Sequence, residues 1–488
     1  MKLKDLVSGI SPVRFEGNEK EEIQGIAYSS KDIKPGFLFA ALKGIKKDGF
    51  DFVEKAVLNG AAVILSEKPK PDNFEKSWIQ VTDAREALAL CSANFYSHPS
   101  QKMKVVGITG TKGKTTLTYL LEEILKKSRL TPGVIGTISY RGPNMSISAG
   151  RTTPEAPDLQ RMLREILEQG ATHCLIEVSS HALDLKRVLG IGFDVVVFVN
   201  LSGDHLDYHI SMEKYFEAKK KLFFLNDKKR IAVVNTDDSW GKKLISQLSK
   251  DVITYGLEPS ALIRGENFKL TEKGIGLSVK HPEGTLSVSS PLLGKPNLYN
   301  ILAAIAVALT LSLPVSAIKE GIAALKGVPG RFEKIENSLG LRIFVDYAHT
   351  DDALRNLLET IRGLNARRIL LVFGAGGDRD KSKRARMGEI AGTLADWAII
   401  TSDNPRSEDP LVIISDIEKG IKKTGATKYE ILPDRREAIE HALSLGEKGD
   451  YILVAGKGHE DYQIIKDKIF HFDDAEVIRE ILKKKEFA

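Results

Sequence analysis

The fold of this chain is decided by the stretch Val105-Val106-Gly107-Ile108-Thr109-Gly110-Thr111-Lys112-Gly113-Lys114-Thr115-Thr116. A short apolar run, typical of a strand, enters a glycine-rich turn, and a helical pattern follows over residues 117–127. This order predicts a phosphate-binding loop, because successive backbone N–H groups at a helix N-terminus can face one anion. In such a loop Lys114 reaches the terminal phosphates of ATP, and the Thr115 hydroxyl holds Mg²⁺.

The glycine spacing of this loop departs from the usual pattern G-x-x-x-x-G-K-[ST]. Ile108 stands where the first glycine is expected, and the glycines fall at Gly107, Gly110 and Gly113. We therefore expect an ATP-using protein from a distinct branch of the phosphate-loop enzymes. The alternative is a plain tight turn between a strand and a helix, but Gly-Lys-Thr in this setting favours a phosphate site.

The length and charge of the chain narrow the classes of protein that fit. A chain of 488 residues is long enough for about three domains. Lys and Arg number 71 against 65 Asp and Glu, which gives a net charge of +6. This mild excess, without a basic block beside aromatic residues, argues against a nucleic-acid partner. It suits substrates that carry phosphates and carboxylates.

Cysteine content and hydropathy predict where the protein works. Only Cys91 and Cys174 occur, without metal-type spacing, so we expect buried thiols in a reducing cytoplasm. The N-terminus lacks a signal-type apolar core, and no run of 18 apolar residues occurs, so we expect no membrane span. We also expect a monomer.

Two breaks in the sequence pattern predict three domains, at residues 1–100, 101–331 and 332–488. The polar, proline-containing segment 97–100 marks the first boundary, and Gly327-Val328-Pro329-Gly330-Arg331 marks the second. Apolar strands alternate with helical stretches, which indicates α/β domains with parallel sheets covered on both faces. The first domain is a small α/β domain, the second a phosphate-loop ATPase sheet, and the third a Rossmann-like sheet. The expected strands are 37–42, 61–65, 174–178, 195–199, 231–234, 343–345, 369–373, 397–401 and 451–455, with a helix at 84–95.

Ionisable residues follow two apolar strands of the predicted central sheet. Glu177 ends one strand, where the carboxyl edge of a parallel sheet binds ligands, and is placed like a metal-binding carboxylate. The following serines could instead cap a helix. The segment 200–209 places two histidines and two aspartates after another strand, a density that is costly unless they bind something. A surface loop is the alternative there.

Lys219 is the lysine that we expect to be drawn inward. On a helix its neighbours at i−4, i−3, i+3 and i+4 are Tyr215, Phe216, Leu222 and Phe223. Desolvation and two adjacent cations would lower the pKa of this lysine. A neutral lysine can react with CO₂ to form a carbamate that binds Mg²⁺. The composition alone favours a lysine that lays its stem on the surface and keeps its ammonium in water.

These residues together resemble the Mur ligases, ATP-dependent amide-forming enzymes of peptidoglycan assembly and cell wall biogenesis. The segment 110–116 resembles the variant phosphate loop of that family, and Ala218-Lys219-x-x-Leu222-Phe223 its carbamylated-lysine motif. Further matches are the segments 177–181 and 200–209, Gly294-x-x-Asn297-x-x-Asn300-x-x-Ala303-Ala304, Gly330-Arg331-Phe332-Glu333 and Asp346-Tyr347-Ala348-His349.

The resemblance covers nearly the whole chain and implies a role for each domain. The first domain would bind the UDP-sugar, the second ATP, and the third the incoming amino acid. It implies catalytic roles for Lys114, Glu177, His205 and Lys219, and a metal site for Mg²⁺ at Thr115, Glu177, His205 and carbamylated Lys219. It implies ATP contacts from Gly110, Thr111, Lys112, Gly113, Lys114, Thr115, Thr116, Asn297, Arg331 and Asp346. It implies UDP-substrate contacts from Ser30, Thr152, Thr153, Ser179 and Arg187.

Within the family, this chain is similar to the enzymes that add the third residue of the stem peptide. Asp403-Asn404-Pro405-Arg406 resembles the version that selects meso-diaminopimelate. A bidentate arginine suits the second carboxylate of diaminopimelate, whereas lysine presents only an ammonium there. An arginine that merely follows a turn proline is the alternative. The implied diaminopimelate site is Arg379, Asp403, Asn404, Pro405, Arg406, Gly456 and Glu460.

The resemblance therefore implies an ATP-dependent ligase that joins meso-diaminopimelate to UDP-N-acetylmuramoyl-L-alanyl-D-glutamate through an acyl phosphate. Four positions depart from the residues that are common in the family: Leu185, Gly203, Pro296 and Asp351. These departures affect individual polar contacts to the UDP-substrate and to ATP, and they do not affect the reaction class. The alternatives are the lysine-adding ligase, a folylpolyglutamate synthetase, and a nucleotide-binding regulatory protein without ligase activity. The segment 403–406 and the ionisable strand ends argue against these alternatives.

Overall fold

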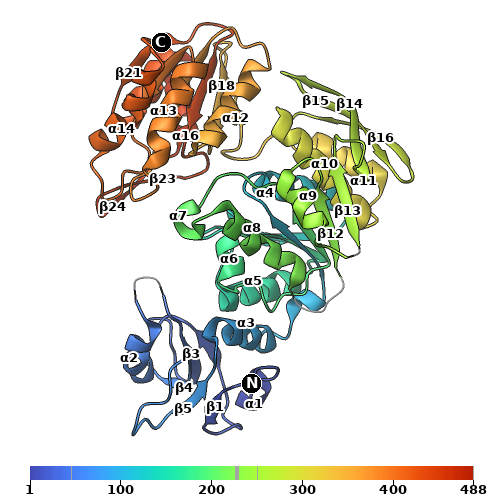
Figure 1. Ribbon diagram of the computed structural model, residues 1–488, viewed down its shortest axis with the longest axis vertical. Helices are drawn as coiled ribbons and strands as arrows, with labels where there is room; N and C mark the ends of the chain where they lie inside the picture. The colour runs from blue at the N-terminus through green and yellow to red at the C-terminus, as the bar shows by residue number, and fades with distance from the viewer. Residues whose placement is uncertain (45–46, 226–229, 250, 487–488) are drawn as a thin grey trace. The chain divides into compact units, whose positions relative to one another are not determined.

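The computed structural model describes residues 1–44, 47–225, 230–249 and 251–486. The chain forms two compact units, each described by itself below (Figure 1). The first unit consists of Met1–Leu201, Glu213–Ala261 and Ala303–Ile318. The second consists of Ser202–Met212, Leu262–Leu302 and Lys319–Ala488.

The first unit begins with a five-stranded sheet in the order β1-β5-β4-β3-β2. Strands β2 to β5 pair in parallel, and β1 runs antiparallel to β5. Leu38 and Leu65 pack on the face with α3, whereas Phe39 and Trp78 pack on the face with α2, as strand alternation requires. The bounds are β1 Arg14–Glu16, β2 Gly25–Ala27, β3 Phe37–Ala41, β4 Ala61–Ser66, β5 Ser77–Gln80, α1 Leu3–Leu6, α2 Val53–Leu58 and α3 Ala84–Phe95.

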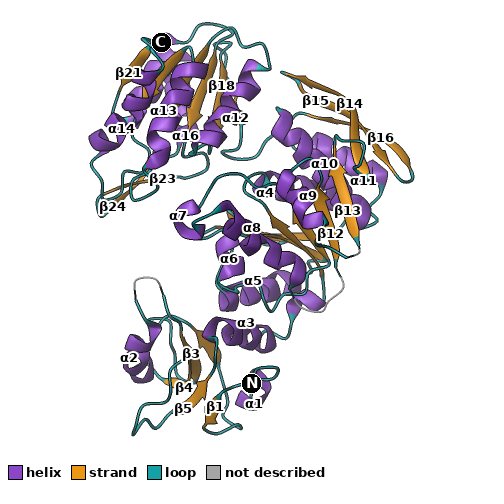
Figure 2. Ribbon diagram, viewed as in Figure 1, coloured by secondary structure: helices purple, strands orange, loops and turns teal. Residues whose placement is uncertain are grey.

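A second sheet in the first unit carries the phosphate loop. Its strands run in the order β13-β12-β11-β6-β10-β7, all parallel, and the antiparallel strands β8 and β9 extend it beyond β7. Helices flank the sheet (Figure 2). The strands are β6 Lys104–Thr109, β7 Pro132–Ile135, β8 Ser139–Gly142, β9 Met145–Ser148, β10 His173–Glu177, β11 Val195–Phe198, β12 Ile231–Asn235 and β13 Val252–Gly256. The helices are α4 Lys114–Lys127, α5 Ala156–Glu168, α6 Ser180–Asp184, α8 Met212–Lys220 and α9 Ser239–Ile245.

The second unit is built on a six-stranded sheet in the order β17-β18-β22-β19-β20-β21. All neighbours pair in parallel except β17 with β18. One face packs on α12, α13 and α14, and the other on α15 and α16. The bounds are β17 Glu333–Ile335, β18 Arg342–Asp346, β19 Ile369–Phe373, β20 Trp397–Ile400, β21 Tyr429–Ile431, β22 Tyr451–Ala455, α12 Asp351–Arg362, α13 Ser382–Leu394, α14 Pro410–Lys423, α15 Arg435–Leu445 and α16 Asp474–Glu486.

Two antiparallel elements of the second unit were absent from the sequence prediction. Strands β14, β15 and β16 form a meander, and β23 and β24 form a hairpin. Their partly exposed strands lack the continuous apolar runs that mark the parallel sheets. The bounds are β14 Ile263–Thr271, β15 Gly274–His281, β16 Gly284–Ser290, β23 Tyr462–Ile465 and β24 Lys468–His471, with α7 Leu206–His209. Helices α10 Lys295–Thr310 and α11 Val315–Ala324 each have residues in both units.

Two expectations about composition can be compared with the structure. Cys91 and Cys174 are buried free thiols, which confirms the expectation that both thiols are buried. Burial raises the pKa of each to about 12. In the part of the chain that the structure describes, no helix is both long enough and apolar enough to cross a membrane.

Candidate functional site

The phosphate loop joins β6 to α4, in the order that the sequence predicts. Gly110 and Gly113 have φ angles of +156° and +88°, a region that favours glycine. Asn200, which follows β11, braces the loop: its Oδ1 accepts from Lys112 N at 3.0 Å and its Nδ2 donates to Lys112 O at 3.1 Å. The loop is therefore anchored at the carboxyl edge of the sheet, where α/β proteins bind ligands.

Two lysine ammonium groups converge on this loop. Lys114 Nζ donates to Gly110 O at 2.9 Å and to Thr111 O at 3.1 Å. Lys219 Nζ, from α8, donates to the same Gly110 O at 2.8 Å and lies 4.6 Å from the ring centroid of Tyr215. Lys219 is only 1% exposed, so the prediction that this lysine is drawn inward is confirmed.

Glu177 lies beside the start of α4, at the end of β10. Its Oε2 accepts from Thr115 Oγ1 at 3.0 Å, which brings together two of the predicted Mg²⁺ ligands. Thr137, which follows β7, donates to the same carboxylate from its backbone N at 3.1 Å and from its Oγ1 at 2.8 Å. The sequence prediction missed Thr137. Its position just after a strand next to β10 is the signal that could have found it.

Two threonines of the predicted UDP-substrate site lie next to Glu177. Thr153 Oγ1 donates to Glu177 O at 2.7 Å and accepts from Ser179 N at 3.1 Å. Thr152 Oγ1 lies 3.1 Å from Thr137 Oγ1. Ser179 Oγ accepts from Ala182 N at 3.2 Å and thus caps α6, the alternative role noted for this segment.

Arg187 is anchored to the same cluster. Its NH1 donates to Thr153 O at 3.1 Å, and its NH2 pairs with Glu155 at 2.8 Å. Its Nε is buried and has no hydrogen-bond partner within the described residues. Burial lowers the pKa of Arg187, and the charge of Glu155 opposes this. A buried donor without a partner is costly, so this atom marks a place where a polar ligand group would be stabilised. Ser30, the other predicted contact, is buried after β2, in the five-stranded sheet domain.

The predicted diaminopimelate residues of the second unit follow β19, β20 and β22. Asn404 is the central contact: its Nδ2 donates to Glu460 Oε2 at 2.6 Å, and its Oδ1 accepts from Ile464 N at 2.8 Å. Asp403 lies against Gly456, where any Cβ would collide with the Asp403 carboxylate. The structure therefore brings Asp403, Asn404, Gly456 and Glu460 together.

Two arginines reach the same loop cluster. Arg406 NH1 donates to Gly377 O at 2.7 Å and lies 2.9 Å from the position that a Cβ on Gly376 would take. The Arg379 Cγ lies 3.9 Å from that position, and its side chain is exposed. Pro405, between Asn404 and Arg406, packs its carbonyl against Gly377. A guanidinium carries five N–H donors, so the hydrogen bond to Gly377 does not saturate Arg406.

The electrostatics of this cluster are dominated by burial. Burial and the charge of Asp403 raise the pKa of Glu460, and hydrogen bonding from Tyr347 opposes the rise. Burial lowers the pKa of His459 to about 3, with the Arg331 charge acting in the same direction, so this imidazole is neutral. The cluster thus presents two carboxylates, those of Asp403 and Glu460, beside cationic side chains.

The predicted ATP residues of the second unit lie on two of its elements. Asn297, on α10, donates from Nδ2 to Leu293 O at 2.8 Å and accepts from Asn300 Nδ2 at 3.0 Å. Asp346 ends β18, and its Oδ2 accepts from Phe332 N at 2.7 Å, next to Arg331. His205 lies in the segment Ser202–Met212 of the same unit and is exposed.

The predicted metal ligands divide between the units. Thr115, Glu177 and Lys219 belong to the first unit and His205 to the second. In the described ranges, no group of three or more His, Cys, Asp or Glu side chains is arranged to hold a metal ion. The four-residue metal set therefore stays a prediction.

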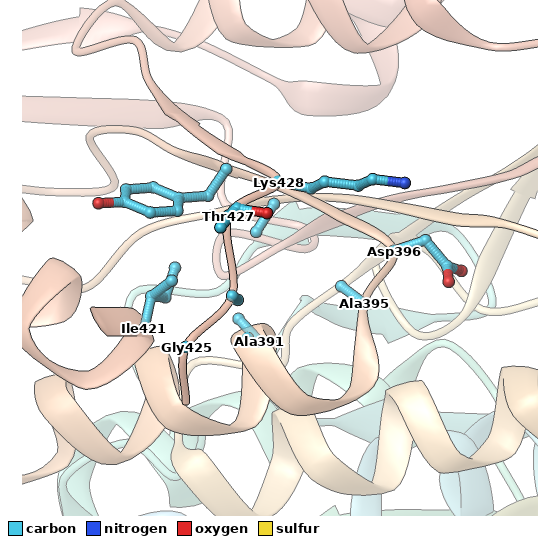
Figure 3. A pocket seen from close by; sticks show the side chains of 11 residues that line it. Ala391, Ala395, Asp396, Ile421, Gly425, Thr427 and Lys428 are labelled. Atoms are coloured by element: carbon cyan, nitrogen blue, oxygen red, sulfur yellow. The ribbon is translucent and has the colours of Figure 1, made fainter. Parts of the chain in front are cut away.

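A separate hollow of about 300 Å³ lies elsewhere in the second unit (Figure 3). It is lined by Ala391 of α13, Ile421 of α14 and residues that precede β20 and β21, such as Asp396 and Lys428. These positions are at the amino ends of the strands. The hollow is thus at the opposite edge of the sheet from the predicted diaminopimelate residues.

Comparison with known proteins identifies relatives over the whole length of the chain. Three family models match: "Mur ligase family, catalytic domain" at residues 22–96, "Mur ligase middle domain" at 108–308, and "Mur ligase, glutamate ligase domain" at 330–458. The UDP-N-acetylmuramoyl-L-alanyl-D-glutamate–2,6-diaminopimelate ligase of Geobacter metallireducens is 45% identical, over 98% of each chain. The ligase of the same name from Caldanaerobacter subterraneus subsp. tengcongensis is 43% identical over 100% of each chain. A solved structure of a ligase of this name matches with a TM-score of 0.71 and 32% identity, covering 100% of this chain and 99% of its own.

Proposed function

The chain belongs to the Mur ligase family, and we propose that it adds meso-2,6-diaminopimelate to UDP-N-acetylmuramoyl-L-alanyl-D-glutamate at the expense of ATP, in peptidoglycan precursor synthesis. Relatives of that name match it over nearly their full length. We assign residues 1–100 to the UDP-sugar, 101–331 to ATP and 332–488 to the amino acid.

The proposal that the protein uses diaminopimelate and not L-lysine rests on one observation. Arg406 and Glu460 are presented by the same loop cluster, with Asn404 bonded to the Glu460 carboxylate at 2.6 Å. The far end of diaminopimelate carries a carboxylate and an ammonium, which a guanidinium and a carboxylate complement in charge. L-Lysine has only the ammonium and would leave Arg406 without its partner. A site built for a charged group rejects an analogue that lacks the group, because its own polar atoms are then left unpaired.

The proposed chemistry has two steps, and the second step consumes the acyl phosphate that the first step forms. The D-glutamate side-chain carboxylate attacks the γ-phosphorus of ATP, the bond to ADP breaks, and an acyl phosphate forms. The amine of diaminopimelate then attacks the acyl carbon, phosphate leaves, and the amine loses a proton as the amide forms. Lys114, at the loop, would neutralise the negative charge on the transferred phosphoryl oxygens.

The first unit also fits a Mg²⁺ ion. The hydroxyl of Thr115 and the carboxylate of Glu177 are hard oxygen ligands and lie 3.0 Å apart, beside the phosphate loop. When bound, Mg²⁺ would supply charge neutralisation for the phosphates. We propose His205 and carbamylated Lys219 as further ligands. The position of Lys219, only 1% exposed and with its Nζ 2.8 Å from Gly110 O of the phosphate loop, supports a role for it beside the phosphates.

The UDP-substrate would lie over the cluster of Thr152, Thr153, Ser179 and Arg187, with Ser30 contributing from the first domain. The buried Nε of Arg187, which has no partner within the described residues, supports this assignment. We further propose a monomer in the cytoplasm, where ATP is available and the two thiols stay reduced.

The experiment that tests this function measures phosphate release from ATP by the full-length protein with the UDP-dipeptide. The amino acid is meso-diaminopimelate, L-lysine, L-glutamate or none. Release that depends on diaminopimelate supports the proposal. Release with L-lysine alone would identify the lysine-adding ligase. L-glutamate-dependent release that occurs only when a folate replaces the UDP-dipeptide would identify a folylpolyglutamate-type enzyme. No release with any acceptor would favour a nucleotide-binding regulator.

A further inference from the structure

Tyr347 follows β18 at a place where three chain segments are locked together in the second unit. A Cβ on Gly330 would collide with the backbone nitrogen of His459. A Cβ on Gly458 would lie 2.7 Å from both Gly330 O and Tyr347 Cβ. Tyr347 N also donates to Gly330 O at 3.0 Å. The segments around residues 330, 347 and 458 therefore cannot shift independently.

The side chain of Tyr347 contacts one residue of each proposed site in this unit. The guanidinium carbon of Arg331, a proposed ATP residue, lies 4.5 Å from its ring centroid. Its hydroxyl donates to Glu460 Oε1, of the proposed diaminopimelate site, at 3.2 Å. The rings of His349 and His459 lie 4.5 and 5.0 Å from the same ring and hold it in place.

The hydroxyl of Tyr347 stays a donor throughout the physiological pH range. Burial, together with the charge of Glu460, raises the pKa of Tyr347 far above its ordinary value. Its hydrogen bond favours the ionised form of Glu460 against the effect of burial. The other charged or titratable groups that act on Glu460 are Asp403, Arg406, Arg435, Lys457 and Tyr462.

We propose that Tyr347 is a positioning residue shared by two substrates: its hydroxyl orients Glu460 toward diaminopimelate, and its ring orients Arg331 toward ATP. This inference rests on the proposed function. It assigns to Tyr347 a task that acts through Glu460 and Arg331. The two tasks use different atoms of one side chain, so they can be separated by substitution.

Tyr347→Phe removes the hydroxyl and keeps the ring. We expect the KM for diaminopimelate to rise about tenfold, as for the loss of a hydrogen bond to a charged group, while the KM for ATP changes less than about twofold. The acidic limb of kcat/KM for diaminopimelate should move to higher pH, because Glu460 loses a donor that favours its ionised form. Tyr347→Leu removes the ring as well, and should raise both KM values.

Tyr429→Phe is the matched control. Tyr429 OH donates to Glu418 Oε1 at 2.8 Å in the same unit, but at the amino end of the sheet, so both KM values and the pH profile should stay at wild-type values. Thermal unfolding of each variant checks that it is folded.

The inference is overturned if Tyr347→Phe leaves the KM for diaminopimelate and the acidic limb unchanged. It is also overturned if Tyr347→Leu leaves the KM for ATP unchanged, or if both variants lower only kcat. A wild-type protein that does not use diaminopimelate would instead refute the proposed function.

Discussion

Lys114 and Lys219 donate to one and the same carbonyl oxygen, that of Gly110, at 2.9 and 2.8 Å. They come from different helices, α4 and α8, and lie 105 residues apart in the chain (219 − 114). Two cations that share one acceptor concentrate positive charge at the phosphate loop. This arrangement suits a polyphosphate.

Lys219→Ala should abolish ligase activity, because it removes the proposed carbamate. Short carboxylic acids, added to the assay, should restore part of the activity by taking the place of the lost anion. Lys220→Ala is the control: Lys220 is the next residue on α8, is partly exposed and pairs with Glu217, so its loss should change little. Phosphate release measures the activity of Lys219→Ala, of Lys219→Ala with added carboxylic acid, and of Lys220→Ala. A wild-type rate for Lys219→Ala without added acid would remove the carbamate from the mechanism.

Lys114→Ala should lower kcat at least tenfold, which corresponds to about 1.4 kcal/mol of barrier. The reason is that the variant lacks the cation that we propose neutralises the negative charge on the transferred phosphoryl oxygens. Single-turnover phosphate release measures the chemical step. Normal turnover in this variant would contradict the assignment of the phosphate loop.

Arg406→Ala should weaken the discrimination between meso-diaminopimelate and L-lysine. The variant lacks the guanidinium that we pair with the second carboxylate, so kcat/KM for diaminopimelate should fall by about tenfold or more while that for lysine stays low or rises. Arg436→Ala, at a surface ion pair with Glu480, serves as the control. An unchanged ratio of the two kcat/KM values in Arg406→Ala would count against this role.

Asp474→Ala should destabilise the second unit strongly. Asp474 and Arg435 are both 0% exposed and pair at 2.7 Å, and Arg435 also donates to Ala455 O at 3.0 Å. Removal of the carboxylate leaves a buried charge without compensation, which costs about 3–5 kcal/mol. Glu480→Ala, which breaks a surface pair on the same helix, should cost less than about 1 kcal/mol. Urea unfolding followed by circular dichroism compares the two, and equal midpoints would disprove the prediction.

Protonation of Glu408 should lower the free energy of unfolding of the protein in acid. Its hydrogen bond from Arg384, followed by that from Asp378 N, lowers its pKa from 4.5 to about 2. Because the folded pKa is below the unfolded value, the stabilisation is present above about pH 4.5 and is lost as the pH falls toward 2. In Glu408→Gln the free energy of unfolding should vary less with pH across this window. If the free energy of unfolding changes equally with pH in the wild type and in Glu408→Gln, the prediction is contradicted.

The elements that could be predicted from the amino-acid sequence are those whose signals are local. The strand β6, the loop and α4 are contiguous, so their order could be read directly. Strands β10, β11, β12, β18, β19, β20 and β22 appear as apolar runs, whereas β7, β13 and β21 were not predicted. The burial of Lys219 followed from apolar neighbours three and four positions away along the chain, of which Leu222 and Phe223 lie in the 3₁₀ helix Lys221–Phe224 that follows α8. The meander β14 to β16 escaped prediction because its half-exposed strands carry no such run.

Which of these residues meet depends on the tertiary structure. Thr137 bonds to Glu177 from 40 residues away, and Tyr347 bonds to Glu460 from 113 residues away. Such pairs arise because parallel strands bring their carboxyl ends to one edge, and the identity of neighbouring strands depends on the order in which they assemble. Periodicity along the chain specifies which face of an element is buried. It does not specify which strand lies beside which, and the contacts of the candidate site depend on that order.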